Sequence, residues 1–390
     1  MFSTPVERSH PHPKEKRMAE ETTLAALQET LRQTGSPWTA GVTSVSELSP
    51  AEKRRLLGVR LPPGMTVADL ERESERNRSL MMSTRGAGAA AAVDWRNVNG
   101  ANYITPVKHQ GNCGSCVAFG TVAALEGRMR VQRGDPNLAV DLSEAQLFYC
   151  YGKSDGVNCD SGWMPEPALK FVRDKGLTDE AHFPYTAGDQ ACSPSAGWEG
   201  SLTFIQDYTN LTNNPNAIKE FIANSGPVTA CFIVYDDFFH YVGGIYKNIV
   251  KSKDPSGHCV SLVGYNDGDG CWIAKNSWGP NWGEARPNST ERGFFRIAYG
   301  ECGIESWAVY GATAIVETGW LNNKRVVGLW TVNQDRNAWA YLDGVGWRRV
   351  AYDNDNIFVD VLTQLATAKS GSRPVNVYQD GGVIKQVYVF

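Results

Sequence analysis

The order of periodic patterns in residues 93–316 is the feature that most limits the possible folds. Helical patterns begin at Cys116, near Ser143 and near Pro165, and another follows Pro215. Strand-like runs come later in the chain, as VTACFIV, CVSLVGYN, CWIAKNSW and GFFRIAYG. Strands that alternated with helices would instead indicate a parallel sheet. The sequence therefore predicts an α+β fold with a largely antiparallel sheet.

Segments of a different character precede this region. Residues 1–20 are polar and charged, and we expect a disordered tail. Residues 21–33 have leucines at helical spacing, and SELSPAEKRRLLG predicts a second helix capped by Ser49. The stretch STRGAGAAAA, residues 83–92, has small side chains and no periodicity, so it indicates a protease-accessible boundary. We therefore treat 21–92 as one unit.

Residues 317–390 are predicted to form a separate small, mainly β domain. Five short strand-like runs, a hairpin turn at QDGG and one amphipathic helix ended by Gly371 make up this tail. We expect Trp330, Trp339 and Trp347 to belong to its core.

Composition narrows the class of protein. The formal net charge is −4, so no basic face predicts binding to nucleic acid. The longest apolar run is far shorter than the roughly 20 residues of a membrane helix. The first 21 residues lack the apolar core of a signal peptide. Nine cysteines without repeated metal-ligand spacing nevertheless favour an oxidising compartment. We expect secretion or residence in another oxidising compartment, through a leader already removed or by another route.

The segment HQGNCGSCVAF, residues 109–119, carries the clearest chemistry. A thiol is a useful nucleophile only as the thiolate, and a free cysteine has a pKa of roughly 8.5. Cys116 is expected on the first turn of a helix, near the positive end of the helix dipole. The small neighbours Gly114 and Ser115 would let a substrate backbone approach.

The base and its partners are expected from other parts of the chain. His258 lies far downstream in GHCVSLVGYN, and Asn276 follows in KNSWGPNWGE. An amide beside an imidazole can accept its N–H and so fix the tautomer and the ring plane. Gln110 is well placed to donate to the oxyanion of a tetrahedral intermediate, beside the backbone N–H of Cys116.

Five ordered motifs resemble the papain-like family of cysteine peptidases. They are VDWR, TPVKHQGNCGSC, LSEAQLFYC, GHCVSLVGYN and KNSWGPNWGE, and the resemblance covers residues 93–316. It implies a helical lobe and an antiparallel β-barrel lobe, with Cys116 and His258 facing each other across a cleft. The same resemblance makes Cys116 the nucleophile, His258 the base and acid, and Asn276 and Gln110 the orienting amide and oxyanion donor. No metal or organic cofactor is implied.

The resemblance also suggests substrate-binding residues. Trp278 would shield the His–Asn hydrogen bond, and Gly162 would pair with the substrate backbone. The resemblance also implies an apolar pocket for the second residue before the scissile bond. Its lining would comprise Met164, Cys231, Cys259 and Trp307, and Trp163 would lie beside it.

The chain departs from the family's pattern at some positions. Val117 replaces a usual aromatic residue, and Gly257 replaces a common Asp. Residues 150–164 lack the His-His insertion of cathepsin B, which favours endopeptidase action.

The segment PWTAGVTSVSELSPAEKRRLLG, residues 37–58, resembles a short cathepsin B type propeptide. By this resemblance, residues 21–92 block the cleft in the non-productive direction. Cleavage is expected within about residues 80–93, and acid would promote it by loosening ion pairs.

Family positions suggest the disulfides Cys113–Cys159 and Cys150–Cys192. The pairing of the other cysteines stays open, and so does the oligomeric state. Three other functional classes compete with a peptidase zymogen that takes protein or peptide substrates. The pair Cys113-x-x-Cys116 could be a redox or half-zinc site. The chain could instead be a catalytically inactive adhesin or carbohydrate-binding protein whose C-terminal tail carries the function, or the triad could transfer acyl groups to amines.

Overall fold

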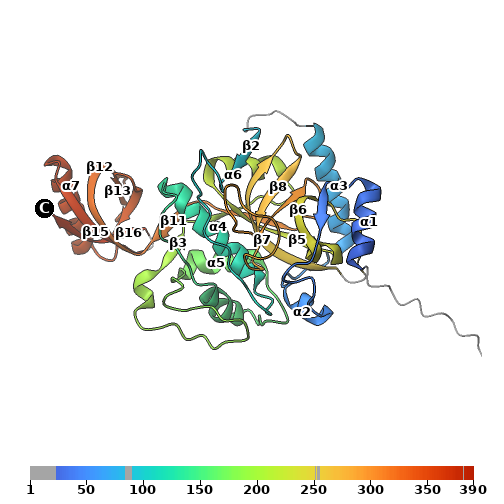
Figure 1. The fold of residues 1–390 in the computed structure, drawn as a ribbon. Coiled ribbons are helices and arrows are strands. Elements are labelled where there is room, and N and C mark those ends of the chain that lie inside the picture. Colours follow the sequence, from blue (N-terminus) through green and yellow to red (C-terminus); the bar gives the residue numbers. More distant parts are fainter. Residues whose placement is uncertain (1–22, 84–89, 251, 253–254, 381) are drawn as a thin grey trace, which may run out of the picture.

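The computed structural model describes residues 23–83, 90–250, 252, 255–380 and 382–390. The expected disordered tail and most of the expected cleavage boundary lie outside these residues. Figure 1 shows a large body and a smaller lobe at the C-terminal end of the chain. None of the helices in the described ranges has the length and apolar character needed to cross a bilayer.

Three helices and one strand make up the N-terminal segment: α1 (Leu24–Thr34), β1 (Trp38–Ala40), α2 (Pro50–Arg55) and α3 (Val67–Ser83). Thr23 caps α1, and α2 begins with a capping box formed by Ser49 and Glu52. The observed α2 is shorter than the helix expected from the sequence, because it already ends at the C-cap residue Leu56. The helix α3 was not predicted, yet its buried Leu70 joins it to the main hydrophobic core.

The helical lobe contains the elements expected from the sequence. They are α4 (Cys116–Arg133), a helical segment with π-type turns at Gln146–Gly152, α5 (Pro165–Lys175) and, beside the sheet, α6 (Pro215–Ser225). The helix α4 ends at Gly134, whose φ of 62° is the left-handed conformation that glycine adopts easily. The second helix differs from the prediction, because it lies a few residues later and its turns are wider.

The large body also contains a nine-stranded sheet with the order β1-β6-β9-β8-β7-β5-β10-β4, in which β2 also pairs with β7. Its later strands are β2 (Ala92–Asp94), β4 (Tyr208–Asn210), β5 (Val228–Val234), β6 (Tyr241–Tyr246), β7 (Ser256–Asn266), β8 (Cys271–Lys275), β9 (Phe294–Ala298) and β10 (Ala308–Ala312). The pairs are antiparallel except β6 with β9. Every residue of β5 and β8 is buried, which explains why these strands are mostly apolar, with Thr229 and Lys275 as the buried polar exceptions. Helix α4 packs against β7 so closely that a Cβ on Gly120 would lie 2.9 Å from Cys259 Sγ.

The N-terminal segment completes one edge of this sheet. Strand β1 pairs antiparallel with β6, with Trp38 opposite Gly244. Gly244 has a φ of 94°, and a Cβ there would lie 2.4 Å from Pro37 O. The tight approach of the two strands therefore depends on glycine at this position.

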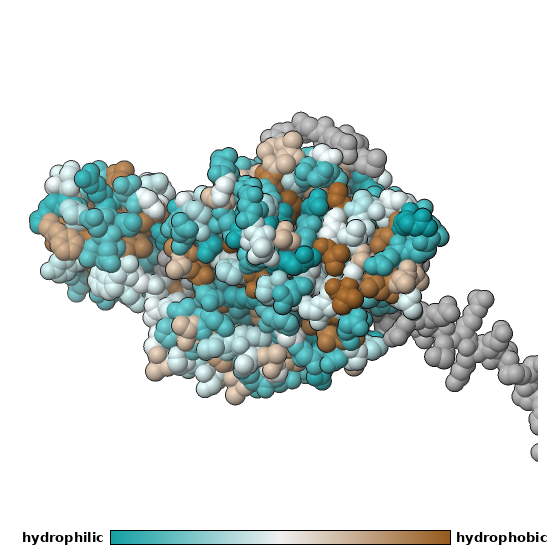
Figure 2. Space-filling view, in the orientation of Figure 1, coloured by the Kyte–Doolittle hydropathy of each residue, from teal (hydrophilic) through white to brown (hydrophobic). Residues whose placement is uncertain are grey.

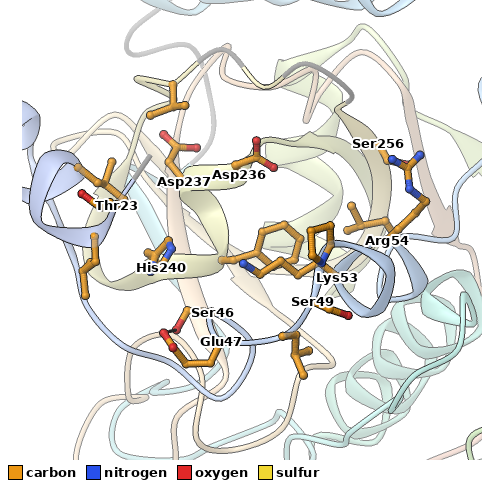
Figure 3. A pocket seen from close by; sticks show the side chains of 17 residues that line it. Thr23, Ser46, Glu47, Ser49, Lys53, Arg54, Asp236, Asp237, His240 and Ser256 are labelled. Carbon is orange, nitrogen blue, oxygen red and sulfur yellow. Dashed lines mark hydrogen bonds between the residues drawn. The ribbon is translucent and has the colours of Figure 1, made fainter. Parts of the chain in front are cut away.

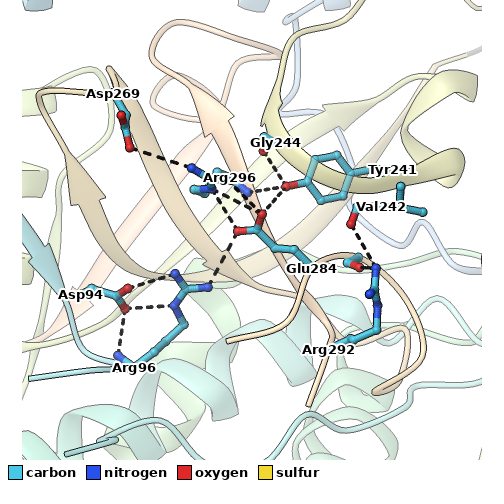
Figure 4. A network of polar contacts seen from close by, with 10 residues as sticks. Asp94, Arg96, Tyr241, Val242, Gly244, Asp269, Glu284, Arg292 and Arg296 are labelled. Carbon is cyan, nitrogen blue, oxygen red and sulfur yellow. Dashed lines mark hydrogen bonds and ion pairs between the residues drawn. The ribbon is translucent and has the colours of Figure 1, made fainter. Parts of the chain in front are cut away.

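A network of charged side chains connects the start of the β2 region to the sheet (Figure 4). Arg96 donates to both carboxylate oxygens of Asp94, at 2.9 Å each, and Glu284 pairs with Arg296 at 3.1 Å. The Tyr241 hydroxyl donates to Gly244 O at 2.7 Å and also contacts Glu284. The network links four segments that are distant in the sequence.

The C-terminal lobe is a closed five-stranded barrel with the order β12-β13-β14-β16-β15. Its elements are β12 (Gly319–Thr331), β13 (Ala338–Leu342), β14 (Gly346–Val350), α7 (Asp355–Ser370), β15 (Pro374–Asp380) and β16 (Val383–Val389). A hydrophobic cluster of its own fills it, and Leu365 of α7 contributes to that cluster. The short pair β3 (Thr203–Ile205) and β11 (Ile315–Glu317) lies where the two parts join. Figure 2 shows the lobe standing apart from the large body.

The expectation for the tryptophans of this lobe was wrong. Trp330 and Trp347 are 51% and 46% exposed, and Trp339 is half-buried. Side chains alternate across a strand, and Ala338, Ala340 and Leu342 occupy the inward positions of β13. The small inward residues fit the narrow barrel, so the large rings point outward.

Candidate active site

Cys116 is the first residue of α4 and is fully buried. Its Sγ accepts a hydrogen bond from the backbone N–H of Gly58, in the N-terminal segment, at 3.2 Å. Burial raises the pKa of the Cys116 thiol well above its ordinary value, and the Gly58 hydrogen bond opposes this only partly. The Cys259 backbone also acts to lower the pKa of the Cys116 thiol, so the thiol lies near the residue that follows His258. Burial therefore disfavours the thiolate in this form.

His258 lies on β7 and is also fully buried. Its Nε2 lies 2.7 Å from Asn276 Oδ1, which is consistent with an N–H donated to the amide oxygen. The ring centroid is 4.8 Å from that of Trp278, and Trp278 in turn stacks on Phe239. Burial lowers the pKa of His258 to about 4, although the Asn276 hydrogen bond acts in the opposite direction.

Gln110 is held in one orientation by residues on either side of the cleft. Its Oε1 accepts a hydrogen bond from the Ser277 hydroxyl at 2.7 Å. Its Nε2 donates to Cys113 O at 2.9 Å and to Leu56 O of the N-terminal segment at 3.2 Å. The amide N–H groups of Gln110 thus already bind a peptide carbonyl oxygen.

The predicted substrate-binding glycines lie directly against the N-terminal segment. The backbone N–H of Trp163 donates to Gly58 O at 2.8 Å, and that of Arg60 donates to Trp163 O at 3.1 Å. A Cβ on Gly162 would lie 2.4 Å from Gly58 O, and one on Gly58 would lie 1.9 Å from Gly114 O. Gly58, Gly114 and Gly162 therefore allow the backbone of the N-terminal segment to lie close to the backbone of the peptidase body beside the Cys116 thiol.

Gly257 and Trp307 form the next part of the cleft. The backbone N–H of Val59 donates to Gly257 O at 3.2 Å. A Cβ on Gly257 would lie 2.2 Å from the Trp307 ring and 2.8 Å from Val59 Cβ. The absence of a side chain at Gly257 thus makes room for Trp307 and Val59. Met164, at the start of α5, is half-buried.

The structure contains the disulfides Cys113–Cys159 and Cys150–Cys192. Cys231, Cys259, Cys271 and Cys302 are free and buried. Cys231 and Cys259 lie opposite each other on β5 and β7. Nothing in the geometry assigns either of them to the apolar pocket, so that role stays a prediction.

Sequence reasoning missed several residues that support the site. Ser277 orients Gln110, although it lies inside a motif already quoted. The Tyr185 hydroxyl contacts Ser115 Oγ at 2.7 Å and donates to Gln110 O at 2.8 Å, and no local pattern marks it. Beneath α4, Lys108 Nζ lies 3.2 Å from Glu126 and 2.9 Å from Glu144, and both carboxylates are buried.

A cavity of about 610 Å³ lies between the N-terminal segment and the sheet (Figure 3). Glu47 and Lys53 line it from one side, and Asp236 and His240 line it from the other. His240 Nδ1 is 3.3 Å from Gly41 O, and burial lowers the pKa of this histidine. His182 Nδ1 lies 2.7 Å from Asp179 Oδ1. Within the described ranges, no group of three or more His, Cys, Asp or Glu side chains could hold a metal ion.

Comparison with known proteins identifies the family of the chain. The model of the papain family cysteine protease matches residues 89–312. The chain belongs to this family. The papain-family region is 36% identical over 237 residues to "Pro-cathepsin H" of Bos taurus. The aligned region covers 58% of this chain and 66% of the bovine protein. It is 37% identical over 224 residues to "Zingipain-2" of Zingiber officinale, covering 56% of this chain and 95% of that protein.

A solved proenzyme of the papain family has a similar fold over a larger part of the chain. It is the digestive procathepsin L2 proteinase from Tenebrio molitor larval midgut, with a TM-score of 0.59 and 28% identity. The similarity covers 75% of this chain and 89% of the insect protein. The α+β papain-like fold and a proenzyme-like arrangement are therefore shown, with the C-terminal β lobe as an addition.

Proposed function

We propose that the chain is the zymogen of a cysteine endopeptidase, which becomes active when residues 21–92 are removed by proteolysis. The observation that carries this proposal is the position of Leu56–Arg60. This segment places a carbonyl on Gln110, an N–H on the Cys116 sulfur and a backbone pair on Trp163. It occupies the groups that hydrolysis of a peptide would need.

The direction of the segment supports inhibition rather than cleavage. Leu56 lies at Gln110, Gly58 at Cys116, and Val59 at Gly257 beside Trp307. By the family resemblance, a substrate places residues that precede the scissile bond in the Trp307 region. The inhibitory segment instead places later residues there, so it runs in the opposite direction and offers no correctly oriented carbonyl.

In the mature enzyme the mechanism follows from the same atoms. Removal of residues 21–92 opens the site to water, which lowers the desolvation that now raises the pKa of Cys116. His258 takes the thiol proton, and the thiolate attacks the scissile carbonyl carbon while Gln110 donates to the developing oxyanion. His258 then gives the proton to the leaving amine, a thioester remains, and water releases the carboxylic acid.

Roles for the other residues follow from their positions. Asn276 fixes the His258 ring, and Trp278 keeps water from their hydrogen bond. Val59 beside Trp307 supports a preference for an apolar residue at the second position before the scissile bond. The two disulfides and the family relationship favour a secreted protein or one in another oxidising compartment.

Mass spectrometry of the incubated precursor tests the proposal. We expect loss of a mass that ends within residues 80–93, and a thiol-alkylating epoxide should label the product on Cys116. The Cys116→Ala precursor should do neither. Addition of a primary amine should leave the peptide products as free acids. Persistent inactivity of the trimmed chain, or transfer of the acyl group to the amine, would contradict the assignment.

A further inference from the structure

The C-terminal barrel has a topology with a recognised binding face. Its five strands pair in the order first-second-third-fifth-fourth and close back on the first, and the pairing of the third strand β14 with the fifth strand β16 is parallel. Helix α7 connects the third and fourth strands. These are the features of an OB-fold barrel, in which the face of the second and third strands commonly binds oligonucleotides or oligosaccharides.

Three aromatic residues lie on the second and third strands, and a fourth lies on the adjacent first strand. Trp330 of β12 lies opposite Trp339 of β13, and Tyr341 of β13 lies opposite Trp347 of β14. We call Trp330, Trp339, Tyr341 and Trp347 the aromatic plate. The Tyr341 and Trp347 rings are 5.4 Å apart and nearly perpendicular. Trp347 also lies over Gly328, where an added Cβ would be 3.2 Å from the indole.

The plate is exposed although the barrel has a filled core of its own. Tyr341 is 39% exposed, and Trp330 and Trp347 are about half exposed. Inward residues already fill the barrel, so stability of the lobe does not require these rings on its surface. Exposed aromatic rings offer broad apolar faces on which the C–H faces of sugar rings can pack.

A cavity of about 660 Å³ adjoins the plate, between the barrel and the peptidase body. Trp339, Trp347 and Tyr352 line it from the barrel, and Arg349 stacks over Tyr352 at 4.1 Å. The buried Arg349 Nε has no hydrogen-bond partner within the described residues. Acidic residues are missing from the described lining of this cavity.

Arg128 lines the same cavity from the peptidase body. Its guanidinium donates to the backbone oxygens of Ser225, Ala312 and Thr313, and it forms no ion pair with a described residue. Arg349 likewise forms no ion pair within the described part of the chain. Two arginine charges without carboxylate partners thus lie beside an aromatic surface, and this favours a ligand that brings its own carboxylates.

We propose that the plate and the adjoining cavity bind a glycan chain that carries carboxylate groups. The sugar rings stack on Trp330, Tyr341 and Trp347, and sugar carboxylates pair with Arg349 and Arg128. A nucleic acid is disfavoured by charge, because residues 317–390 contain eight Lys and Arg against seven Asp and Glu and so have a net charge of only +1. A phosphate backbone requires a continuous basic track.

Calorimetric titration of the full-length Cys116→Ala chain, which cannot cleave itself, tests this site. The titrants are hexagalacturonate, a neutral galactose oligomer of equal length, and an oligothymidylate. We expect hexagalacturonate to bind most tightly. Trp347→Ala and Arg349→Gln should each weaken it about tenfold or more.

Matched variants separate the plate from general surface effects. Trp320→Ala is the aromatic control, because Trp320 is 48% exposed on the same barrel but packs against Tyr378, away from the plate. Arg325→Gln is the charge control. Both should bind hexagalacturonate like the parent, and Trp347→Phe should retain most of the affinity.

Four results would overturn the proposal. They are no binding of hexagalacturonate at millimolar concentration, equal affinity for the neutral oligomer, tighter binding of oligothymidylate, and equal losses in Trp320→Ala and Trp347→Ala. Concentration-dependent dimers that Trp347→Ala abolishes would show instead that the plate binds a second copy of the chain.

Discussion

The substitution Gly58→Ala should open the precursor without affecting the catalytic groups. A Cβ on Gly58 would lie 1.9 Å from Gly114 O and 2.7 Å from Gly114 Cα, and both are backbone atoms that cannot rotate away. The segment must therefore shift by more than about 1 Å, since van der Waals contact needs a separation above roughly 3 Å.

Such a shift breaks three hydrogen bonds of the inhibitory segment. They run from Gly58 N to Cys116 Sγ, from Trp163 N to Gly58 O, and from Gln110 Nε2 to Leu56 O. At about 1 kcal/mol each, the closed state loses about 3 kcal/mol. This corresponds to an opening equilibrium that is about 150 times more favourable.

The rate of Cys116 alkylation in the intact precursor reports this opening. Iodoacetamide is added at neutral pH for short times, and the modified peptide is quantified by mass spectrometry. The control is Gly64→Ala, which lies in the same segment and has no atom within 4 Å of an added Cβ. Gly64 has a φ of 80°, so the control carries backbone strain without a clash in the cleft. Equal alkylation rates in Gly58→Ala and Gly64→Ala would refute the reasoning.

Three further predictions concern the buried groups of the peptidase body. Lys108→Met should destabilise the chain to urea by about 3–5 kcal/mol, because it removes the cation that pairs directly with the buried Glu126 and Glu144, whereas the exposed Lys170→Met should change stability by less than about 0.5 kcal/mol. Asn276→Ala should lower kcat/KM of the mature enzyme about 10- to 100-fold and shift its acidic pH limb, and an unchanged pH profile would argue against a positioning role. The precursor should open more readily as pH falls from about 6.5 towards 4, because burial depresses the pKa of His258 to about 4 and protons bind preferentially to the open state. Hydrogen exchange at the Gly58 amide of Cys116→Ser, corrected for intrinsic rates, should show this trend, and an opposite trend would contradict it.

Much of the large body could be predicted because local patterns and packing agree there. Helix α4 has a periodic apolar sequence and a glycine in the left-handed conformation at its end. Strand β5 is apolar at every position except Thr229, because the protein covers both its faces. The roles of Cys116, His258, Asn276 and Gln110 required the resemblance to the papain family, and they remain proposals until activity is measured.

Other features depend on contacts between distant segments. Helix α3 is rich in charge, and only tertiary packing of residues such as Leu70 reveals its buried side. Strand β6 contains two adjacent glycines, which usually weaken a strand, and it is supported by β1 and β9. The outward direction of Trp347 depends on strand register, and a shift of one residue would reverse it.

The edge strand that the N-terminal segment supplies has a consequence for refolding. Leu27, Trp38 and Leu70 belong to the hydrophobic core of the peptidase body. Removal of the N-terminal segment would therefore remove part of that core. The cleaved molecule would then refold poorly after unfolding. The lifetime of its folded state would be set by the height of the unfolding barrier and not by the folding equilibrium. Activation would therefore also limit the lifetime of the enzyme, because a mature molecule that unfolds no longer has the N-terminal segment with which it first folded.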